Sequence, residues 1–344
     1  MAERKCISLV IPAYNEAETI PLLYDALVPV LDSLKDRYDF EIVFTDNHST
    51  DDTFFLLQAL AQRDPRIHVL RFSRNFGFQR SILTGYQWAH GDAAIQLDCD
   101  LQDPPSLIPE FLAKWEEGWH VVYGVRRTRQ EGQVITWVRK VFYRVIRALS
   151  EVELPVDAGD FRLIDRRILD ILANCRHANP YLRGTIAKAG FKQIGIAYDR
   201  PARAAGTTKF SLLSYIAIAA DGIVSQSVIP LRIATYVGLF IGMLTILGSI
   251  GYGIGHLLYG SDWPRGFATL VILFLCSIAL NAVFLGVLGE YVARIYRSIL
   301  GDPLTVVEQA IPPSFIHRAP EWRQPEVQAQ NAASQPRVTL KTET

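Results

Sequence analysis

Short apolar segments alternate with amphipathic segments along the first 124 residues of the chain. The apolar segments are rich in β-branched residues and cover residues 6–11, 40–45, 67–71, 93–97 and 120–123. The amphipathic segments between them have helical spacing and cover residues 17–34, 52–62, 77–89 and 106–117. This order predicts right-handed β-α-β units and an α/β fold with a mostly parallel sheet. Ligands of such sheets bind at the carboxyl ends of the strands.

The pattern changes after this region. Residues 133–150 have the spacing of a helix, with apolar residues on one side and basic residues elsewhere. Residues 160–198 return to the α/β pattern and end in a predicted strand over residues 191–198. Residues 210–228 are apolar on one side, which is typical either of a helix lying in a membrane interface or of an ordinary amphipathic helix of a globular domain.

Two long segments towards the carboxyl end contain no charged residue. Residues 233–258 run for 26 positions, and residues 267–289 for 23 positions, without Asp, Glu, Lys or Arg. About 20 apolar residues are enough for a helix to cross the hydrocarbon core of a bilayer. A pair of buried core helices is the alternative, but two successive uncharged runs of this length are rare in soluble domains. We therefore expect two transmembrane helices joined by a short connector, residues 260–266.

The flanking charges predict the orientation of this hairpin. One arginine precedes the first helix and two follow the second, whereas the connector holds a single arginine close to an aspartate. Because the side with more Lys and Arg is usually cytoplasmic, we expect an integral membrane protein with the large domain and both termini in the cytoplasm. Glycines at 238/242 and 251/255 have a spacing that permits close helix packing within one chain or in a homo-oligomer.

These segments divide the chain into four expected regions. Residues 1–209 form the large cytoplasmic domain, residues 210–231 an interfacial amphipathic region, and residues 232–300 the two membrane helices with a juxtamembrane segment. Residues 301–344 form a cytoplasmic tail, which is expected to be largely disordered because it is rich in Gln, Ala and Pro after Pro312.

Composition narrows the class of protein only slightly. Lys plus Arg and Asp plus Glu balance at 35 each, so the overall charge gives no sign of a nucleic-acid partner. The four cysteines are far apart and lack metal-finger spacing, which is typical of reduced thiols in the cytosol. The apolar run before Pro12 is too short for the core of a signal peptide.

Polar motifs follow the predicted strands where each strand ends. Residues 12–16, Pro-Ala-Tyr-Asn-Glu, come directly after the first strand and can contribute to a nucleotide site, although many such loops look alike. Residues 46–51, Asp-Asn-His-Ser-Thr-Asp, follow the second strand. An acidic residue there can accept hydrogen bonds from a base or ribose, while Ser49 or Asp51 can also cap the next helix.

The motif with the clearest chemistry is Asp-Cys-Asp-Leu-Gln-Asp-Pro-Pro, residues 98–105, after the fourth strand. Two carboxylates two residues apart at a strand end can converge on Mg²⁺ or Mn²⁺, which prefer oxygen ligands and bridge to phosphate. Such an ion would offset the charge of a leaving diphosphate. The alternative is a solvated acidic turn, which suits Asp103, as a helix cap before two prolines, better than Asp98 and Asp100.

A further acidic motif and several basic residues complete the candidate chemistry. Residues 157–162, Asp-Ala-Gly-Asp-Phe-Arg, either place a carboxylate near a reaction centre or form a tight turn before a strand, and the residues alone leave both open. The basic residues can attract anionic lipid or clamp a specific phosphate. They are Arg126, Arg127, Arg129, Arg139, Lys140, Arg203 and Lys209.

This ordered set of motifs resembles the family 2 glycosyltransferases with the GT-A fold. The resemblance extends from residue 5 to residue 300 and includes a basic motif at 203–209 before the predicted hairpin. With that hairpin, the chain is similar to the polyprenyl-phosphate branch, which includes dolichol-phosphate mannose synthases, bactoprenol glucosyltransferases and aminoarabinose transferases. An Asp-x-Asp pair alone is common, whereas the ordered set is specific.

The resemblance implies roles for individual residues. The nucleotide-sugar would be contacted by Pro12, Tyr14, Glu16, Asp46 and Asp98. The metal, Mg²⁺ or Mn²⁺, would be held by Asp100 and Gln102 with Asp98 beside it. The diphosphate or the acceptor phosphate would be bound by Arg126, Arg139, Arg203 and Lys209. Asp157 would lie nearest the transfer and, with Asp98 and Asp100, complete the catalytic set.

One departure from the family pattern concerns the second motif. Many relatives have Asp-Asp-Gly-Ser-x-Asp where this chain has residues 46–51. Asn47 replaces a carboxylate, and His48 stands where the relatives have a conformationally permissive glycine. The resemblance therefore leaves the geometry of base recognition open, and with it the choice between UDP and GDP.

The expected reaction is a metal-dependent transfer of a sugar, with inversion, from a nucleotide-sugar to undecaprenyl or dolichyl phosphate. Glucose from UDP-glucose is the first choice, by similarity to the bactoprenol glucosyltransferases. A phosphate monoester is largely ionised at neutral pH because its second pKa is near 6, so Asp157 would position the acceptor or the metal shell rather than act as an obligatory base. Truncation at residue 228 is expected to spare nucleotide binding and to cripple transfer to long-chain acceptors.

Other functions remain open at this point. A dolichyl-phosphate mannose synthase-like enzyme would use GDP-mannose, and a membrane-tethered binding protein on the same fold would have no activity. A processive polysaccharide synthase usually has more membrane spans and a Gln-x-x-Arg-Trp sequence, which this chain lacks. Two spans beside a large domain also argue against a transporter.

Overall fold

The computed structural model describes residues 4–126, 158–175, 180–199, 229–259, 266–299 and 303–318. The chain divides into two compact units, each of which is described by itself. The first unit comprises Met1–Arg139, Val152–Thr208 and Pro303–Thr344, and the second comprises Lys140–Glu151 and Lys209–Asp302.

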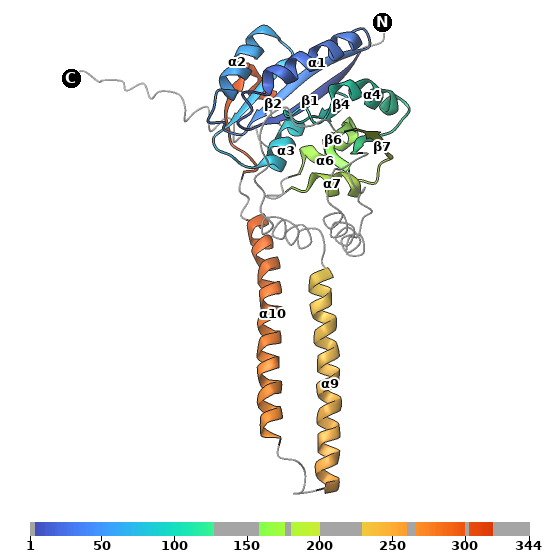
Figure 1. The fold of residues 1–344 in the computed structure, drawn as a ribbon, viewed down its shortest axis with the longest axis vertical. Coiled ribbons are helices and arrows are strands. Elements are labelled where there is room, and N and C mark those ends of the chain that lie inside the picture. Colours follow the sequence, from blue (N-terminus) through green and yellow to red (C-terminus); the bar gives the residue numbers. More distant parts are fainter. Residues whose placement is uncertain are drawn as a thin grey trace, which may run out of the picture. The chain divides into compact units, whose positions relative to one another are not determined.

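The first unit is built on an eight-stranded sheet with the order β7-β5-β6-β4-β1-β2-β3-β8 (Figure 1). The strands are β1 (Lys5–Ala13), β2 (Tyr38–Asp46), β3 (Ile67–Phe72), β4 (Ala93–Gln96), β5 (Val121–Arg126), β6 (Ala158–Asp165), β7 (Gln193–Tyr198) and β8 (Val307–Ile311). Strand β1 pairs in parallel with β2 and β4, β2 with β3, and β5 with β7. Strands β6 and β8 pair antiparallel with their neighbours. The sheet is therefore mixed but mostly parallel, as the sequence predicts.

Helices cover both faces of this sheet. They are α1 (Ile20–Leu34), α2 (Thr53–Arg63), α3 (Phe78–Trp88), α4 (Ile108–Glu116), α6 (Arg166–Ala173) and α7 (Leu182–Lys188), with short 3-10 helices η1 (Pro105–Leu107) and η3 (Pro313–Arg318). The buried hydrophobic residues of α1, α2 and α4 belong to one cluster, and those of α6 and α7, with most of those of α3, belong to another. The predicted boundaries of β1 to β5, of α1 to α4 and of β7 agree with the structure to within three residues, whereas the predicted helix over residues 133–150 lies outside the described residues.

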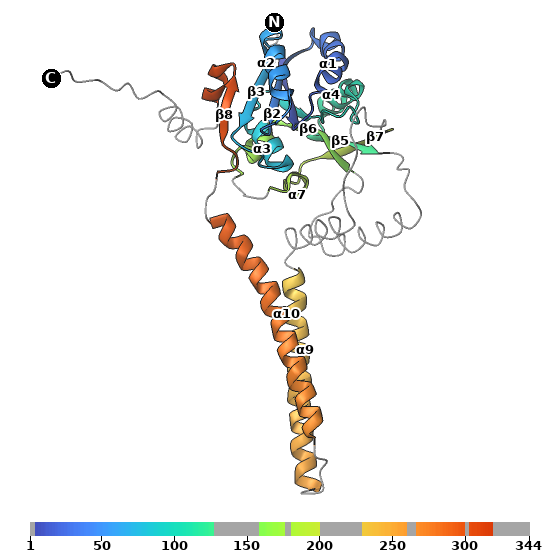
Figure 2. The same cartoon turned by 60° about the vertical axis from the view of Figure 1, so that its left-hand side comes forward.

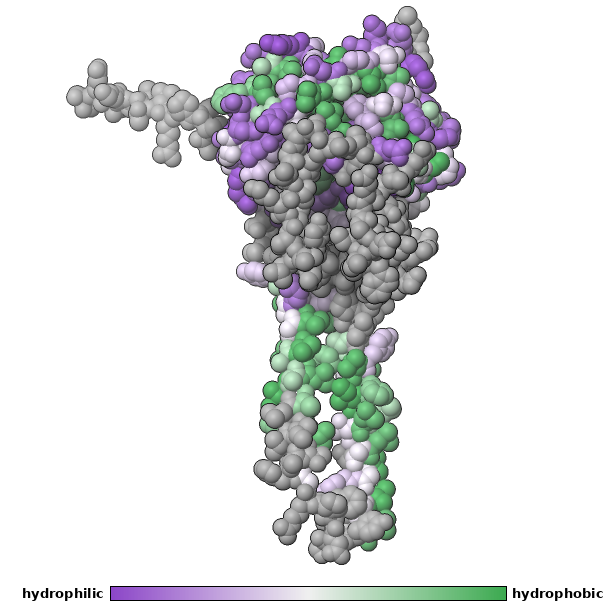
Figure 3. Space-filling model, in the orientation of Figure 1, coloured by the Kyte–Doolittle hydropathy of each residue, from purple (hydrophilic) through white to green (hydrophobic). Residues whose placement is uncertain are grey.

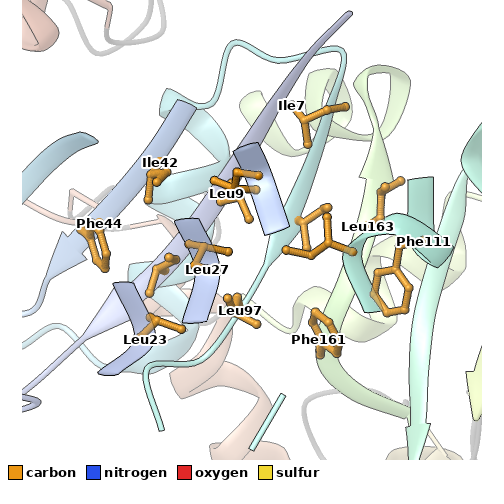
Figure 4. Close-up of a cluster of buried hydrophobic side chains, with 14 of the residues drawn as sticks. Ile7, Leu9, Leu23, Leu27, Ile42, Phe44, Leu97, Phe111, Phe161 and Leu163 are labelled. Atoms are coloured by element: carbon orange, nitrogen blue, oxygen red, sulfur yellow. The ribbon is translucent and has the colours of Figure 1, made fainter. Parts of the chain in front are cut away.

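Alternation along β1 explains why the two clusters form. Ile7, Leu9 and Ile11 point to the cluster beneath α1, and Val10 points to the opposite one. In Figure 4, Leu23 and Leu27 of α1 lie over the side chains of this strand and its neighbours. A strand covered on both faces needs apolar residues at nearly every position, which is the continuous run that the sequence shows. Each fully buried aliphatic side chain contributes about 2 kcal/mol.

The carboxyl-terminal segment differs from the expectation of a disordered tail. Strand β8 pairs antiparallel with β3 and forms one edge of the sheet (Figure 2). Phe315 of η3 is fully buried in a third cluster with Leu70 and Phe72 of β3. The expectation was wrong for residues 303–318 because five residues of β8 gain their stability from pairing with a distant strand, which composition does not reveal. Residues 319–344 lie outside the described residues.

The second unit contains two long apolar helices, α9 (Ile229–Tyr259) and α10 (Phe267–Ile299). Ala234–Gly255 and Cys276–Ala293 are long and apolar enough to cross a membrane, with mean hydropathies of 1.9 and 1.6 and none of either window buried. Their described residues are mostly hydrophobic on the face seen in Figure 3. A Cβ at Gly238 would lie 3.6 Å from the Phe284 ring, so α9 and α10 approach each other there. Of the predicted interfacial region, residues 210–231, the first 19 lie outside the described residues and the last three begin α9.

Candidate active site

Three predicted motifs meet at one edge of the sheet because they follow three neighbouring strands. Ala13 of β1 pairs with Asp46 of β2, and Val10 of β1 pairs with Gln96 of β4. Past these pairs the chain continues into residues 12–16, 46–51 and 98–105. The carboxyl ends of parallel strands face the same way, so the first three motifs form a single polar rim, in the position where α/β sheets bind ligands.

Hydrogen bonds hold the first two loops against each other. The Asn15 backbone N–H donates to Ser49 Oγ at 3.0 Å, and the Thr50 N–H donates to Asn15 Oδ1 at 2.8 Å. The Glu16 N–H donates to Thr53 Oγ1 at 2.8 Å. The loops are thus fixed by polar side chains that the chain supplies itself, which leaves the site preorganised.

Each of the three loops contains one non-glycine residue in the left-handed backbone region. These are Asn15 at φ 55°, His48 at φ 62° and Leu101 at φ 58°. Such conformations cost energy and cluster at functional sites. The conformation of His48 matches the prediction that this position suits glycine. Its ring Nδ1 lies 2.9 Å from the Phe72 carbonyl oxygen, which helps to hold the loop.

Asp46 is a buried carboxylate with one oxygen free of hydrogen bonds. Its Oδ1 accepts from the Ser49 N–H at 3.0 Å, whereas Oδ2 accepts no hydrogen bond from the described residues. Burial raises the pKa of Asp46, although the hydrogen bonds from Ser49 oppose this. The cation beside Oδ2 is Arg71, whose Nε lies 3.9 Å away. An orphaned buried acceptor suits an N–H or O–H donor of a ligand.

The other predicted nucleotide residues lie on the first loop. Tyr14 is exposed, and Glu16 is half-buried with its Oε2 accepting from Thr19 Oγ1 at 2.7 Å. The Pro12 carbonyl oxygen accepts from Cys99 Sγ at 3.3 Å. This contact joins the first loop to the Asp98–Asp100 motif, so the residues predicted for the nucleotide and those predicted for the metal lie on adjoining loops.

The third motif gathers negative charge around Asp98. Burial, together with the nearby carboxylates of Asp103, Asp160 and Asp100, raises the pKa of this carboxyl to about 8, although a hydrogen bond from Gln96 opposes the shift. Gln96 Nε2 donates to Asp98 Oδ1 at 2.7 Å, and the Gln102 N–H donates to Asp100 Oδ1 at 3.1 Å. Such a concentration of acid is stabilised by a cation.

The metal prediction fits this chemistry with one restriction. Among the described residues, no three His, Cys, Asp or Glu side chains form a group that could hold a metal ion by themselves. Mg²⁺ is often bound by only one or two carboxylates together with substrate phosphates. Asp98 and Asp100, with Gln102 as an amide ligand, would hold an ion only together with the diphosphate of a bound nucleotide.

Two residues that the sequence offered as possible helix caps contact other parts of the fold. Asp103 is buried and accepts from the Tyr198 hydroxyl at 2.6 Å. This hydrogen bond joins the third motif to the distant strand β7, to which Tyr198 belongs. Asp51 accepts from the Thr53 N–H at 3.0 Å at the start of α2, whereas Ser49 binds the first loop instead.

The fourth motif brings Asp160 to the acid cluster. Arg183 Nε and Nη2 donate to the two Asp160 carboxylate oxygens at 2.8 Å each. Burial alone would raise the pKa of Asp160, but the hydrogen bonds and charges of nearby arginines lower it below its ordinary value. The sequence prediction missed both residues of this pair. The signal for Asp160 was present as the second acid of the motif, whereas Arg183 lies on α7 and is brought near only by the fold.

Arg126 is the one predicted phosphate-binding cation within the described part of the chain. It ends β5, and its Nε is buried without a hydrogen-bond partner. A Cβ at Gly159 would lie 3.3 Å from Arg126 Nη2, so a glycine makes room for the guanidinium. Asp157, Arg139, Arg203 and Lys209 lie outside the described residues, as do Arg127, Arg129 and Lys140.

Polar loops and a cluster of acidic residues at the carboxyl ends of the strands of an α/β sheet are typical of enzymes that act on activated phosphates. The model of the family described as "Glycosyl transferase family 2" matches residues 8–172. The chain belongs to this family of glycosyltransferases, and its sheet with helices on both faces is the predicted GT-A arrangement.

Individual relatives match along nearly their whole length. The chain is 36% identical over 314 residues to the uncharacterized glycosyltransferase YkcC of Bacillus subtilis (strain 168), covering 88% of this chain and 93% of the relative. It is 34% identical over 305 residues to the SfII prophage-derived bactoprenol glucosyl transferase of Shigella flexneri, covering 88% and 98%.

Solved structures are more distant. The mannosyltransferase PcManGT of Pyrobaculum calidifontis, in complex with GDP-Man and Mn²⁺, is 18% identical with a TM-score of 0.41, covering 83% of this chain and 88% of that protein. The glucosyl-3-phosphoglycerate synthase of Mycobacterium tuberculosis, in complex with Mn²⁺, UDP and phosphoglyceric acid, is 20% identical with a TM-score of 0.44, covering 64% and 76%.

Proposed function

We propose that this glycosyltransferase moves a sugar from a nucleotide-sugar to polyprenyl phosphate at the cytoplasmic face of a membrane. The observation that carries the proposal is the carboxylate cluster around Asp98 at the carboxyl ends of the strands. The kinship with bactoprenol glucosyl transferases over 98% of their length supports a polyprenyl phosphate acceptor and makes glucose the first choice of sugar.

The donor would bind along the polar rim. Asp46 Oδ2, buried and without a hydrogen-bond partner among the described residues, would accept from the base or ribose. Pro12, Tyr14 and Glu16 would line the same pocket. The diphosphate would then extend towards Asp98 and Asp100, and Gln102 would complete the ligands for Mg²⁺ or Mn²⁺. That ion would supply charge compensation for the leaving diphosphate.

The reaction is a single displacement at the anomeric carbon. An oxygen of the acceptor phosphate attacks that carbon, the bond to the diphosphate breaks, and the nucleoside diphosphate leaves with the electron pair, so the configuration inverts. The acceptor is already largely ionised at neutral pH. The protein mainly has to bring two anions together, for which Arg126, Arg139, Arg203 and Lys209 are proposed. Asp157 would position the acceptor.

The two apolar helices have a plain purpose in this scheme. Each buried CH₂ of the acceptor chain contributes about 0.8 kcal/mol to membrane binding, so the acceptor does not leave the bilayer easily. Spans within α9 and α10 would anchor the enzyme beside it. With positive charge favouring the cytoplasmic side, the catalytic domain and both termini would be cytoplasmic.

The proposal is tested with the purified full-length protein in lipid nanodiscs. The assay combines undecaprenyl phosphate, Mg²⁺ or Mn²⁺, and a panel of UDP- and GDP-sugars. We expect one donor to give polyprenyl-phosphate-sugar with inverted configuration, and we expect chelation of the metal to stop the reaction. Product from GDP-mannose alone would favour the mannose synthase alternative. Nucleotide binding without product from any donor would favour a non-catalytic binding protein.

A further inference from the structure

The segment that follows the second apolar helix reaches the predicted nucleotide pocket. Strand β8 pairs with β3, and the Ser73 N–H donates to the Val306 carbonyl at 3.0 Å. Two further contacts fix the segment. The hydroxyls of Thr305 and Thr84 lie 2.8 Å apart in the interior, and the Phe315 ring stacks on His68 with centroids 4.3 Å apart. This segment is therefore an integral edge of the catalytic domain.

An irregularity in the strand pairing places an acid beside Arg71. The register between β3 and β8 shifts between Arg71 and Phe72, opposite Glu308. Glu308 Oε2 lies 3.7 Å from Arg71 Nε and 3.7 Å from His48 Nδ1. Arg71 packs its guanidinium 4.2 Å above the Phe54 ring, so its position is restricted.

Arg71 thus has two carboxylates within 4 Å of its Nε atom. Its Nε lies 3.9 Å from Asp46 Oδ2 and 3.7 Å from Glu308 Oε2, so neither acid holds it in a direct hydrogen bond. Asp46 is fully buried, whereas 52% of the Glu308 side chain is exposed. Without the charge of Glu308, the guanidinium would be attracted by Asp46 alone and would engage the oxygen that a donor nucleotide needs.

We propose that Glu308 is a positioning residue for donor binding, which keeps Arg71 from closing on Asp46 and so leaves Asp46 Oδ2 available to the nucleotide. The inference rests on the proposed function, because it takes the pocket around Asp46 as the donor site. It gives the segment beyond the membrane helices a role in donor affinity. It also predicts that Glu308 affects the binding of the donor and not that of the lipid acceptor.

The experiment measures the Kd of UDP and of GDP by calorimetry with the full-length protein, together with KM for donor and acceptor. In Glu308→Gln we expect Kd of the preferred nucleotide and KM of the donor to rise about five-fold, the size expected for partly exposed charge pairs. The acceptor KM and kcat should stay within about two-fold, because a group that affects binding of the donor equally in the ground state and the transition state leaves kcat unchanged. Gln309→Ala, at the next exposed position of β8, is the matched control and should leave all values unchanged.

A double-mutant cycle separates this role from simple support of the strand. If Glu308 acts through Arg71, Glu308→Gln should have no further effect on Kd in an Arg71→Met background. An unchanged Kd in Glu308→Gln, an equal loss in the Arg71→Met background, or the same loss in Gln309→Ala would overturn the inference. A wild-type protein that binds neither nucleotide defeats both the inference and the proposed function. Nucleotide binding without sugar transfer defeats only the proposed function, and the Kd comparison then still decides the inference.

Discussion

At the scale of single residues, the acid cluster is the feature that most constrains the chemistry. Asp98 is surrounded by three other carboxylates, and burial makes its charge unfavourable unless a cation is present. The hydrogen bond from Gln96 holds its Oδ1 in place. Replacement of these acids therefore tests directly whether a metal ion binds at this motif.

We expect Asp98→Asn and Asp100→Asn each to lower kcat by about 10²-fold or more, as removal of electrostatic stabilisation at a transition state does. The apparent affinity for Mn²⁺ should fall as well, which a titration of activity against metal concentration measures. Asp25→Asn changes an exposed acid of α1 and is the matched control. Full activity of both site variants would contradict the metal site at this motif.

A second prediction concerns the stability of the catalytic domain. It is based on the ion pair between Asp64 and Arg66, which are not residues of the candidate site. Arg66 Nη2 donates to Asp64 Oδ2 at 2.7 Å, and the Asp64 side chain is only 7% exposed. Burial alone would raise the pKa of Asp64, but the hydrogen bonds and charge of Arg66 outweigh it and lower the pKa. A lowered folded-state pKa stabilises the fold above about pH 4, and this contribution is lost as the pH falls through the folded-state value.

Asp64→Asn should therefore destabilise the catalytic domain by about 2 kcal/mol at pH 7, the size of a hydrogen bond to a charged group. The difference from wild type should shrink as the pH is lowered below about 4. Thermal unfolding in detergent over a range of pH measures this. Asp39→Asn serves as the control, because Asp39 and Arg4 form an ion pair in which both side chains are 54% exposed. A deficit independent of pH would exclude the charge as the cause.

At the scale of elements, the structure assigns β8 and η3 to the catalytic domain. Phe315 is fully buried, although it belongs to a segment whose composition predicted disorder. Its stacking on His68 and its cluster with β3 explain why the edge strand stays attached. An edge strand held only by backbone hydrogen bonds would be attached to the sheet less firmly.

Phe315→Ala should cost about 3–5 kcal/mol, as large-to-small changes of a buried phenylalanine do. At roughly 2–4 °C per kcal/mol for a domain of this size, Tm should fall by roughly 10 °C. Differential scanning fluorimetry of the detergent-solubilised protein measures the shift. Phe55→Ala is the matched control, because Phe55 is 66% exposed and its loss should be nearly neutral. Equal shifts for the two variants would mean that the segment does not stabilise the domain.

At the scale of the whole molecule, the path of the chain determines which parts of the catalytic unit a truncation removes. The catalytic unit contains residues on both sides of the apolar helices in sequence. Truncation at residue 228 therefore removes β8 as well as the two helices, so loss of nucleotide binding in that variant would not contradict the proposed function. The expectation that such a truncation spares nucleotide binding no longer follows.

A cleaner variant replaces residues 229–302 with a flexible Gly/Ser linker of about 20 residues, which keeps β8. We expect this variant to bind nucleotide with near-wild-type Kd and to lose transfer to undecaprenyl phosphate in membranes. Transfer to a short, water-soluble polyprenyl phosphate should be better preserved. Calorimetry measures the nucleotide Kd, and a radiolabelled-sugar assay measures transfer to each acceptor. Undiminished transfer to the long-chain acceptor in vesicles would contradict the anchoring role of the helices.

The sequence by itself determined most of the helices and strands and pointed to the candidate site residues. Alternating apolar segments predicted β1 to β5 and their helices, because a sheet covered on both faces requires continuous apolar strands. The uncharged runs predicted α9 and α10, because length and hydropathy are local properties. Asp46, Asp98 and Asp100 were predicted as site residues because polar residues at the strand ends of a parallel sheet share one edge.

Only the tertiary structure decided the contacts between segments distant in sequence. The Asp160–Arg183 pair, the bond from Tyr198 to Asp103 and the approach of Glu308 to Arg71 each join residues from different elements. The same holds for β8, four of whose five residues pair with a strand more than 200 positions earlier. Local propensity carries no information about such partners, since each contact depends on the packing of the whole sheet.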